Sequence, residues 1–388
     1  MKLAYIHYHH QRNLGIEKKM QEVAAAAELK NLPMDFFLVN DFFDKAEGNL
    51  RFSKIHYDIC FPSNIFKEKA FRKFRFIQQA VPLNAYDAIV LRYPTMGIEN
   101  KRFFKRYGPK IITEHHCYEV DEILGESGLK RLLFALIETY CRKRILPKVA
   151  GIIGVTNEIR RKQLRNLAPN TPSLVLPNGI SVQSTPFTRF QKFNGKDLTL
   201  VFIASYFASY QGLERLIEGA KMYSGNVKFK LILIGEIPPD LKKCIQIQQR
   251  DNVHFEIAGR KTASELNAYY GEANLGIGSL GFHTKNLKEA CTLKVREYMA
   301  RGLPFIYAYD DPDFSGNEPF SHKFSNEPVP VDFQKIVDFA RKVTQDESCS
   351  EEMRQIAFKK MDWSIKIQAM YRFACEAVSA YKERASHD

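Results

Sequence analysis

Short, continuous apolar runs that alternate with helical patterns are the feature that most restricts the fold of this chain. "DAIVLRYP" (87–94), "KIITEHH" (110–116) and "AGIIGVT" (150–156) are predicted to be buried strands, with a helix near 129–146 between the last two. Strands that are apolar on both faces are typical of parallel sheets covered by crossover helices. "KLAYIHY" (2–8), an Ala-rich helical stretch and "DFFLVN" (35–40) begin the same pattern. The first half is therefore predicted to be a doubly wound α/β sheet.

The alternation starts again after "PSLVLPNGI" (172–180), whose Pro-Asn-Gly turn predicts a domain boundary near Asn178. "DLTLVFIAS", "FKLILIGE", "NVHFEIAGR" and "LPFIYAYD" are strand-like and are separated by helical patterns. The segment 363–381 is an amphipathic helix with no strand after it. We expect an α/β protein of two Rossmann-like domains that face each other across a cleft: residues 1–178, joined by a C-terminal helix at 363–388, and residues 179–362. Ligands of such sheets bind at the carboxyl ends of the strands.

Length and composition agree with two domains in a reducing compartment. A chain of 388 residues is long for one core, and its 29 Phe and 45% hydrophobic content can fill two. The seven cysteines form no C-x-x-C pair, which favours a cytosol over a disulfide framework. "MKLAYIHYHH" has no long apolar stretch, so we expect no signal peptide. No apolar run is long enough to span a bilayer, and we expect a cytoplasmic protein.

Two glutamates stand eight positions apart in "NLKEACTLKVREYMARGLPFI" (286–306). On one helix they would be separated by about 80°, so they would not share a face. Thr292 is a plausible N-cap, which places Glu289 in the loop before the helix and Glu297 about one and a half turns inside it. The two carboxylates can then hold two separated hydroxyl-bearing groups of one ligand.

This arrangement resembles the E-x7-E motif of the retaining glycosyltransferases of family 4, which have the GT-B fold. The resemblance extends over nearly the whole chain. It includes Gly15 in the first loop, "ITEHH", "VLPNGI", "FIAS…QGLERLIEGA", "LILIGEIPP" and "LKVREYMARGLP". In the family, the first Glu contacts the donor sugar and the second the nucleotide ribose. The resemblance thus implies a sugar-contacting role for Glu289 and a ribose-contacting role for Glu297.

The activity that the resemblance implies is transfer of a sugar from a nucleotide-sugar to a lipid-linked or oligosaccharide acceptor, with retention of the anomeric configuration. Such an enzyme would act in cell-surface polysaccharide or glycan synthesis. GT-B enzymes neutralise the diphosphate with protein groups, so no metal or other cofactor is expected. Two alternatives remain open at this stage: a nucleotide-sugar epimerase on the same fold, and a non-catalytic sugar-binding relative.

The chain departs from the family at the diphosphate. An Arg and a Lys usually clamp it from the first loop of the second domain, and the matching positions are Ser205 and Gln211. Buried phosphate charges need other cations. Lys294, in the first turn of the predicted helix, is expected to be the principal diphosphate partner, with Lys288 or Arg260 as a secondary one.

Histidines cluster near the predicted strand ends. His115 and His116 end a middle strand, and His7, His9 and His10 lie near the first loop. No Cys or carboxylate accompanies them at metal-ligand spacing. We therefore predict that His115 and His116 contact substrate and serve catalysis; alternation puts them on opposite sides of the strand. The Asp-x-Asp of "DDPD" (310–313) follows a proline turn and is predicted to be an ordinary loop rather than a metal site.

The net charge is +13, and its meaning depends on where in the chain the basic residues lie. The segment 64–81 combines a helical apolar stripe with five basic residues against one acidic residue. Such a helix suits an anionic membrane surface, and the alternative is an amphipathic helix packed on the first sheet. No RNA- or DNA-binding motif accompanies it, so a nucleic-acid partner is not expected. A peripheral position on the inner membrane face is a corresponding expectation.

Overall fold

The computed structural model describes residues 1–9, 14–40, 55–59, 73–95, 100–125, 129–165, 167–247 and 252–385. The chain divides into two compact units. Unit 1 comprises residues 1–177 and 363–388, and unit 2 comprises residues 178–362. The long last helix belongs to unit 1 because its apolar face packs with residues of the first sheet.

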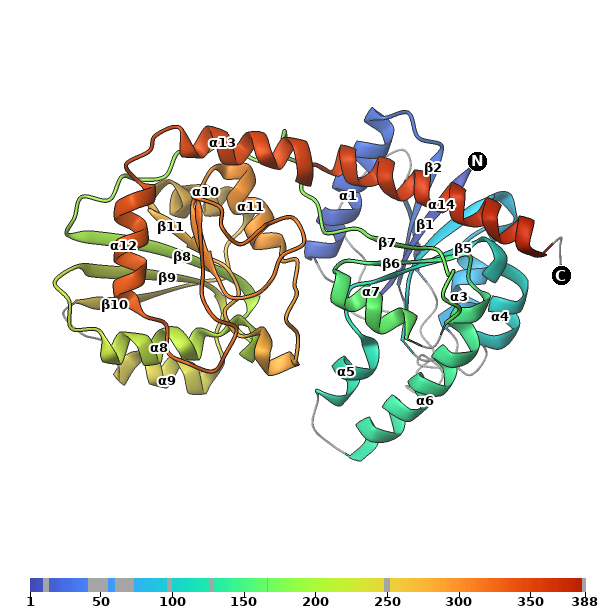
Figure 1. Ribbon diagram of the computed structural model, residues 1–388, viewed down its shortest axis with the longest axis horizontal. Coiled ribbons are helices and arrows are strands. Elements are labelled where there is room, and N and C mark those ends of the chain that lie inside the picture. The colour runs from blue at the N-terminus through green and yellow to red at the C-terminus, as the bar shows by residue number, and fades with distance from the viewer. Residues whose placement is uncertain are drawn as a thin grey trace. The chain divides into compact units, whose positions relative to one another are not determined.

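Unit 1 contains a seven-stranded parallel sheet with helices on both faces (Figure 1). The strands are β1 (Leu3–His9), β2 (Met34–Asn40), β3 (Ile55–Ile59), β4 (Ala88–Arg92), β5 (Ile111–His115), β6 (Gly151–Gly154) and β7 (Ser173–Val175). The helices are α1 (Leu14–Leu29), α3 (Lys73–Ala80), α4 (Asn100–Tyr107), α5 (Glu119–Leu124), α6 (Leu129–Ile145), α7 (Asn157–Leu164) and α14 (Trp363–Ala385).

The strand order in unit 1 is β3-β2-β1-β4-β5-β6-β7, and each neighbouring pair is parallel. The direction in which strands are added reverses between β1 and β4. One face of the sheet is covered by α1 and α14, which bury Met20, Trp363 and Ile367. The other face is covered by α3, α4 and the last turns of α6, which bury Phe74, Phe104 and other apolar residues. The sheet is therefore a buried middle layer.

Unit 2 repeats this architecture with a six-stranded parallel sheet. Its strands are β8 (Asp197–Tyr206), β9 (Lys228–Glu236), β10 (Val253–Gly259), β11 (Leu275–Ile277), β12 (Phe305–Tyr307) and β13 (Ser321–Lys323). Its helices are α8 (Leu213–Met222), α9 (Pro239–Ile247), α10 (Ala263–Glu272), α11 (Leu293–Arg301), α12 (Phe333–Val343) and α13 (Cys349–Ile356). The order β10-β9-β8-β11-β12-β13 reverses between β8 and β11.

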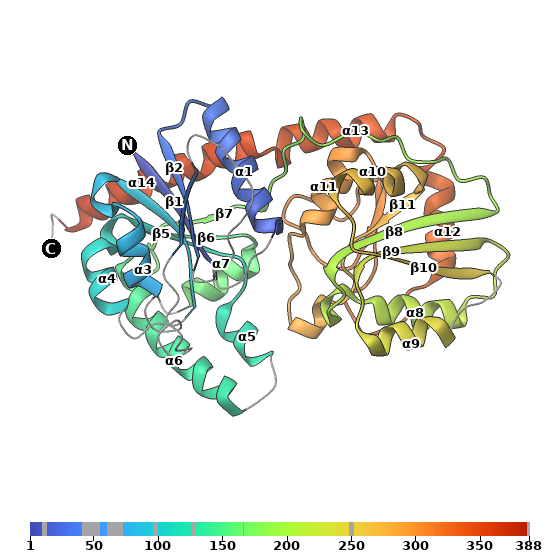
Figure 2. The ribbon, with the colours of Figure 1, turned by 180° about the vertical axis from the view of Figure 1, so that it is seen from behind.

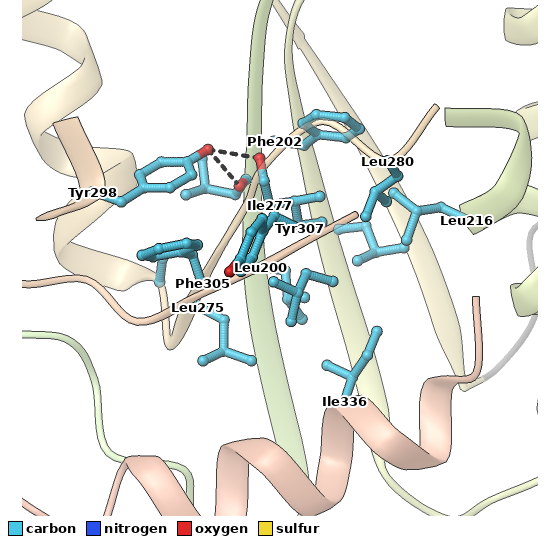
Figure 3. Packing of buried hydrophobic residues seen from close by; sticks show 14 of the residues in the cluster. Leu200, Phe202, Leu216, Leu275, Ile277, Leu280, Tyr298, Phe305, Tyr307 and Ile336 are labelled. Carbon is cyan, nitrogen blue, oxygen red and sulfur yellow. Dashed lines mark hydrogen bonds between the residues drawn. The ribbon is translucent and has the colours of Figure 1, made fainter. Parts of the chain in front are cut away.

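The core of unit 2 fixes the start and direction of α11 (Figure 3). Tyr298, on α11, is fully buried, and its hydroxyl donates to the carbonyl oxygens of Val201 (3.3 Å) and Ile277 (3.0 Å). The ring lies over Gly276, where a Cβ would come within 2.7 Å of it. At the end of α11, Gly302 takes a left-handed conformation (φ 77°) that terminates the helix. These contacts hold the helix against the ends of β8 and β11.

The α/β fold with two doubly wound sheets confirms the predicted fold class. Most elements agree with the sequence prediction to within a few residues, including α6, β8 and β9. One difference concerns Gly15, which was expected in a loop: α1 already begins at Leu14, so Gly15 is in its first turn. Among the described residues, no helix is both long and apolar enough to cross a bilayer.

The predicted basic helix at 64–81 is described only in part. Residues 64–72 lie outside the described ranges, and α3 covers 73–80. Phe74 and Ile77 of α3 are buried in the core of unit 1, and so is Val81 just after it. For this described part, the apolar stripe packs on the sheet, as the alternative interpretation expected.

Candidate active site

The carboxyl ends of the strands carry a polar cluster in each unit, at the point where the strand order reverses. In open α/β sheets, this point leaves a crevice in which ligands bind. In unit 1 the cluster surrounds the ends of β1, β4 and β5. In unit 2 it surrounds the ends of β8 and β11 and the start of α11. The two clusters are described separately below.

The cluster of unit 1 borders a pocket of about 170 Å³. We call it the β4–β5 pocket. It is lined by Tyr8, Lys73, Arg92, Tyr93, Pro94, Thr95, Glu114, His116, Cys117, Glu119 and Glu122. Its walls thus combine two cations and three carboxylates with aromatic rings, a composition suited to a polar ligand.

Glu114, on β5, is the best-connected carboxylate at this pocket. It is buried, and it accepts hydrogen bonds from the Tyr5 hydroxyl (2.6 Å) and the Lys19 ammonium (3.3 Å). Burial alone would raise its pKa, but the charge of Lys19 and the contact with His116 hold the pKa well below its usual range. Glu114 therefore stays ionised, and its charge is balanced within the protein.

His116, just after β5, is partly buried, and its Nε2 lies 2.9 Å from Glu114 Oε1 and 3.3 Å from Lys19 Nζ. Burial, with the charges of Arg92 and Lys19, lowers the pKa of His116 to about 3. The ring is thus neutral at physiological pH. The shorter contact, to the carboxylate, favours a proton on Nε2, which leaves Nδ1 as an acceptor for a ligand hydroxyl.

His115, unlike His116, has no ring nitrogen available to a ligand. Its side chain is fully buried, with Nδ1 2.7 Å from Glu119 Oε1 and Nε2 3.0 Å from Thr113 Oγ1. The ring also stacks on Tyr93, with 4.9 Å between the ring centroids. Glu119 in turn accepts from Arg142 at 2.5 Å. The structure therefore corrects the predicted catalytic place of His115: both ring nitrogens are engaged and no surface is exposed to a substrate.

In unit 2 the central feature is Lys294. It extends from the first turn of α11, and its ammonium donates to the side-chain oxygen of Gln211 and lies 4.7 Å from the centroid of the Phe202 ring. Ser279, after β11, donates to the same Gln211 oxygen at 2.9 Å. Among the described residues, no carboxylate lies within ion-pair distance of Lys294. Burial lowers the pKa of Lys294 to about 7.

The loop after β8 fits closely against the loop after β11. Gly212 (φ 75°) begins α8, and a Cβ there would meet the backbone of Gly281 and Leu280 at 2.7 Å. Backbone bonds run from Leu280 N to Gln211 O (2.9 Å) and from Gly281 N to Tyr210 O (3.2 Å). These contacts fix Gln211, and through it the ammonium of Lys294, at the crevice between β8 and β11.

The loop that holds Glu289 is fixed from behind by Arg296. This fully buried guanidinium forms two bonds to Asp311 (2.8 and 2.7 Å) and one to Asp313 (3.0 Å). It also donates to Asn178 O (3.0 Å) and Cys291 Sγ (2.8 Å). The Asp-x-Asp of "DDPD" thus binds an arginine.

Glu289 and Glu297 take the predicted positions on either side of the helix start. Glu289 is partly exposed in the loop and forms an isolated bridge with Asp310. α11 begins at Leu293, although the Thr292 side chain bonds to the Tyr309 hydroxyl (2.7 Å) instead of capping the helix. Glu297 accepts from Arg301 at 3.1 Å, one turn later, and remains partly exposed.

The remaining predicted residues lie on the surface. Gly15 is exposed at the start of α1. Arg260, after β10, is largely exposed and pairs with Glu236 at 2.5 Å. Lys288 is exposed in the loop before α11, where its carbonyl accepts from Asp310 N. His10, from the predicted histidine cluster, lies outside the described residues.

Sequence reasoning missed Arg92 and Lys73, the two cations of the β4–β5 pocket. Arg92 is the last residue of β4, so a search for polar residues at strand ends would have found it. Lys73 gave no such signal. It belongs to the basic segment 64–81, and the sequence analysis assigned the charges of that segment together to a membrane surface.

Comparison of the structure with solved structures identifies the fold. A glycosyltransferase from Rickettsia africae ESF-5 has a TM-score of 0.67 at 13% sequence identity, over 97% of this chain and 98% of that one. The sucrose-phosphate synthase from Thermosynechococcus elongatus has a TM-score of 0.65 at 15% identity, over 98% and 99% of the two chains. Anabaena HepE in complex with UDP-glucose has a TM-score of 0.61 at 11% identity, over 98% and 100%.

Sequence comparisons add nothing to this result. No family profile matches the chain. No curated protein matches it either. Since the structural similarity covers nearly the full length of both chains, the fold is that of the GT-B glycosyltransferases.

Proposed function

We propose that this protein is a retaining glycosyltransferase that uses a UDP-sugar as donor. The observation that supports it most is Lys294. In the part of the chain that the structure describes, Lys294 has no carboxylate partner at the crevice between β8 and β11. An enclosed positive charge without a counter-ion is unfavourable in the free protein, as its lowered pKa reflects. A bound diphosphate would supply the missing anion. Several proteins of the same fold were solved with UDP or UDP-glucose.

The position of Lys294 also offers a replacement for the cation that the family pattern has and this chain lacks after β8. The resemblance places a lysine where this chain has Gln211, and the ammonium of Lys294 lies within hydrogen-bond reach of the Gln211 side chain. A cation from α11 would thus occupy the place of the missing cation after β8. The N-terminus of α11 adds backbone N–H groups and a favourable dipole.

In this proposal the donor is held by three groups of unit 2. Lys294 neutralises the diphosphate, and its positive charge stabilises the leaving group as the sugar–oxygen bond breaks. Glu289 contacts hydroxyls of the transferred sugar, and Glu297 contacts the ribose. Neither role requires a metal. His116 offers the neutral Nδ1 as an acceptor for a hydroxyl; with a pKa of about 3 it is a weak base, so it positions rather than deprotonates.

A thermal-shift and calorimetric screen of UDP, GDP, ADP and CMP tests this proposal. We expect UDP to bind to the wild type and Lys294→Met to weaken binding about ten- to a hundredfold, the range for hydrogen bonds to charged groups. Lys243→Met is the matched control, because Lys243 is exposed on α9. Absence of binding by all four nucleotides would refute the donor site. Binding without transfer or hydrolysis would favour a sugar-binding relative, and turnover of donor without an acceptor would favour an epimerase.

The acceptor in this proposal is lipid-linked or a glycan, and contact with an anionic membrane would occur through α6. Leu132, Leu136 and Tyr140 repeat every four residues on this helix and are 56%, 60% and 56% exposed. Leu133, between the first two, is also exposed. Figure 2 shows the first turns of α6 extending away from the sheet of unit 1. An exposed apolar stripe of this kind is typical of a surface that binds another protein or a membrane.

The charges of α6 point to anionic lipid as that partner. Lys130, Lys143 and Arg144 are exposed, whereas Glu138, the acidic residue of the helix, is buried. An apolar stripe with basic residues and no exposed carboxylate fits the headgroup region of an anionic bilayer. In this proposal α6 contacts the membrane, and the membrane role of the 64–81 helix stays a prediction, because residues 64–72 lie outside the described ranges.

Vesicle co-sedimentation tests the membrane surface. We expect wild-type protein to bind vesicles rich in phosphatidylglycerol, and Leu132→Glu with Leu136→Glu to remove binding. Leu29→Glu, at a leucine of α1 that is 68% exposed, is the control and should bind like the wild type. Unchanged binding of the double variant would exclude the stripe, and a shift of the wild type from monomer to dimer without vesicle binding would assign it to a second copy of the chain.

A further inference from the structure

A buried ion pair contacts His116, the histidine that lines the β4–β5 pocket. The pair joins Lys19 of α1 to Glu114 of β5, with 3.3 Å between Nζ and Oε1, and both side chains are buried. The same Oε1 lies 2.9 Å from His116 Nε2, and Oε2 accepts from the Tyr5 hydroxyl at 2.6 Å. Glu114 thus connects α1, β1 and the end of β5 at one point.

Lys19 is also held by the last helix of unit 1. Its ammonium lies 5.3 Å from the centroid of the Trp363 ring, at the start of α14. The indole N–H of Trp363 donates to Glu22 at 3.1 Å, three residues after Lys19 on α1. An ammonium over an indole face is a favourable contact, more so when both groups are shielded from water. These contacts give Lys19 a fixed position beside Glu114.

The charge of Lys19 determines where the protons of this cluster lie. Glu114 stays ionised, and the ammonium of Lys19 balances its charge. His116 therefore needs no second proton to balance the carboxylate. Its Nε2–H donates to Glu114 Oε1, and Nδ1 keeps its lone pair for an acceptor role.

Other titratable groups surround His116. Arg92, on β4, also disfavours a charged ring. Tyr5 and Cys117 keep their protons, since burial and neighbouring carboxylates raise their pKa values. The pocket lining also includes Tyr8, Lys73, Tyr93, Glu119 and Glu122. Lys19 contacts both Glu114 Oε1 and His116 Nε2, each at 3.3 Å, so its charge acts on the two groups together.

Loss of the Lys19 charge would leave buried Glu114 without the cation that contacts it. A proton would then bind to the cluster at a pH at which the wild type binds none. If His116 takes this proton, both ring nitrogens become donors. If Glu114 takes it, the new carboxyl O–H donates to Nε2, and the ring proton moves to Nδ1. In both cases Nδ1 no longer accepts a hydrogen bond.

We propose that Lys19 is a positioning residue for the acceptor substrate: through Glu114, it fixes the His116 ring so that Nδ1 accepts from the acceptor hydroxyl. Trp363 supports this role by holding the ammonium in place. The inference rests on the proposed function, in which His116 contacts that hydroxyl. The hydrogen bond sets the direction of the lone pairs on the hydroxyl oxygen, which is a contribution to orientation and not to proton transfer.

NMR of the ring nitrogens of His116 tests the inference without any substrate. Protein labelled with 15N-histidine gives different shifts for protonated and unprotonated ring nitrogens, and His116→Gln identifies the signals. In the wild type we expect a neutral ring with its proton on Nε2, also at pH 5, because burial and neighbouring cations lower the pKa of His116 to about 3. A wild-type ring with its proton on Nδ1, or one that becomes charged between pH 6 and 7, would overturn the inference.

Variants separate the charge of Lys19 from its bulk. In Lys19→Met, the pH midpoint for protonation of Nδ1 should rise by about one to three units, the range for a neighbouring charge. Lys19→Arg keeps the charge and should keep the wild-type state of the ring. Lys18→Met is the matched control, because Lys18 is an exposed lysine of the same helix, and its midpoint should not change.

A melting curve for each variant identifies any loss of folding, and the measurement on wild type does not depend on it. An unchanged midpoint in folded Lys19→Met would overturn the inference. So would a midpoint in folded Lys19→Arg that rises as far as in Lys19→Met, since the charge would then not be the cause.

Binding and transfer separate this inference from the proposed function. UDP should bind to Lys19→Met as to wild type, whereas transfer to the acceptor should fall at low pH and recover above the new midpoint. If UDP binds but the midpoint does not move, the role of Lys19 is wrong and the donor site stands. If the midpoint moves but no nucleotide binds, the control of the His116 ring by Lys19 stands and the glycosyltransferase proposal is wrong. Identical pH profiles of transfer in wild type and Lys19→Met would show that the ring does not act on the acceptor.

Discussion

Binding of UDP should depend on pH in a way that identifies Lys294 as the diphosphate partner. In the free protein, burial lowers the pKa of Lys294 to about 7. A diphosphate within hydrogen-bond distance would favour the charged ammonium and raise the pKa again. Binding must therefore draw a proton from solution whenever the pH lies above the pKa of the free protein.

The size of the effect follows from the two pKa values. At pH 7 about half of the Lys294 side chains are already charged, so binding takes up about half a proton; at pH 9 it takes up about one. The apparent affinity should fall about fiftyfold between pH 7 and pH 9, because neutral lysine must be protonated at a cost of about 1.4 kcal/mol per pH unit. UDP does not contribute in this range, since its terminal phosphate titrates near pH 6.

The lowered pKa of Lys294 also determines how the stability of the folded protein changes with pH. The folded pKa lies below the value of the unfolded chain, so below pH 7 the folded protein bears the full cost of a charged, enclosed lysine. As the pH rises from 7 towards 10.5, the unfolded state holds more protons than the folded one, and the folded protein gains stability. Bound UDP removes this cost. The stabilisation by UDP, measured as a rise in Tm, should therefore be largest near pH 7 and smaller at pH 9.

Calorimetry in two buffers of different ionisation enthalpy measures the proton uptake, and titrations at pH 7, 8 and 9 measure the affinity. Lys294→Met should abolish both the proton uptake and the pH dependence, while Lys243→Met should preserve them. An affinity for UDP that stays constant from pH 7 to pH 9 in the wild type would refute the reasoning. So would a pH dependence that survives in Lys294→Met.

Two further predictions concern the other candidate residues. Glu289→Gln should lower transfer at least about a hundredfold with an unchanged Tm, because a partly exposed loop carboxylate contributes little to packing; activity within a few-fold of wild type would remove it from the site. His116→Ala should lower transfer without loss of folding, whereas His115→Ala should lower the Tm, because it leaves Glu119 and Thr113 without their buried partner. Equal Tm values for wild type and His115→Ala would contradict that structural role.

The sequence was sufficient for the fold because the strands are continuous apolar runs. "LVFIAS" and "LILIG" lie in β8 and β9 almost as predicted. Elements without this signal were not predicted: β3 has the polar residues His56 and Asp58 among its five, and β13 consists of Ser321, His322 and Lys323. Such strands form because their backbones hydrogen-bond to the edge of a neighbouring strand. That pairing depends on the assembled sheet and not on the local sequence.

The site was predicted less completely, for a physical reason. Alternation placed His115 and His116 on opposite sides of β5 but could not say which side is covered. That depends on which side chains meet there: on one side Tyr93, Glu119 and Arg142 enclose His115. Likewise, the sequence places Arg92 at a strand end, but only the structure shows that Glu114, its register partner on β5, pairs with Lys19.

Lys294 shows that a charge can be kept when the residue that supplies it changes. The resemblance places a cation at position 211, after β8, and this chain supplies one from position 294, on α11, that reaches Gln211. If the site requires the charge and not its origin, moving the cation back should restore binding. The double variant Gln211→Lys with Lys294→Met should therefore bind UDP more tightly than Lys294→Met alone, by about tenfold or more. The single variant Gln211→Lys should bind UDP no better than wild type at pH 9, since two ammonium groups would then compete for one place. If the double variant binds no better than Lys294→Met, the two positions are not equivalent, and Lys294 acts through a contact other than the one that the resemblance implies.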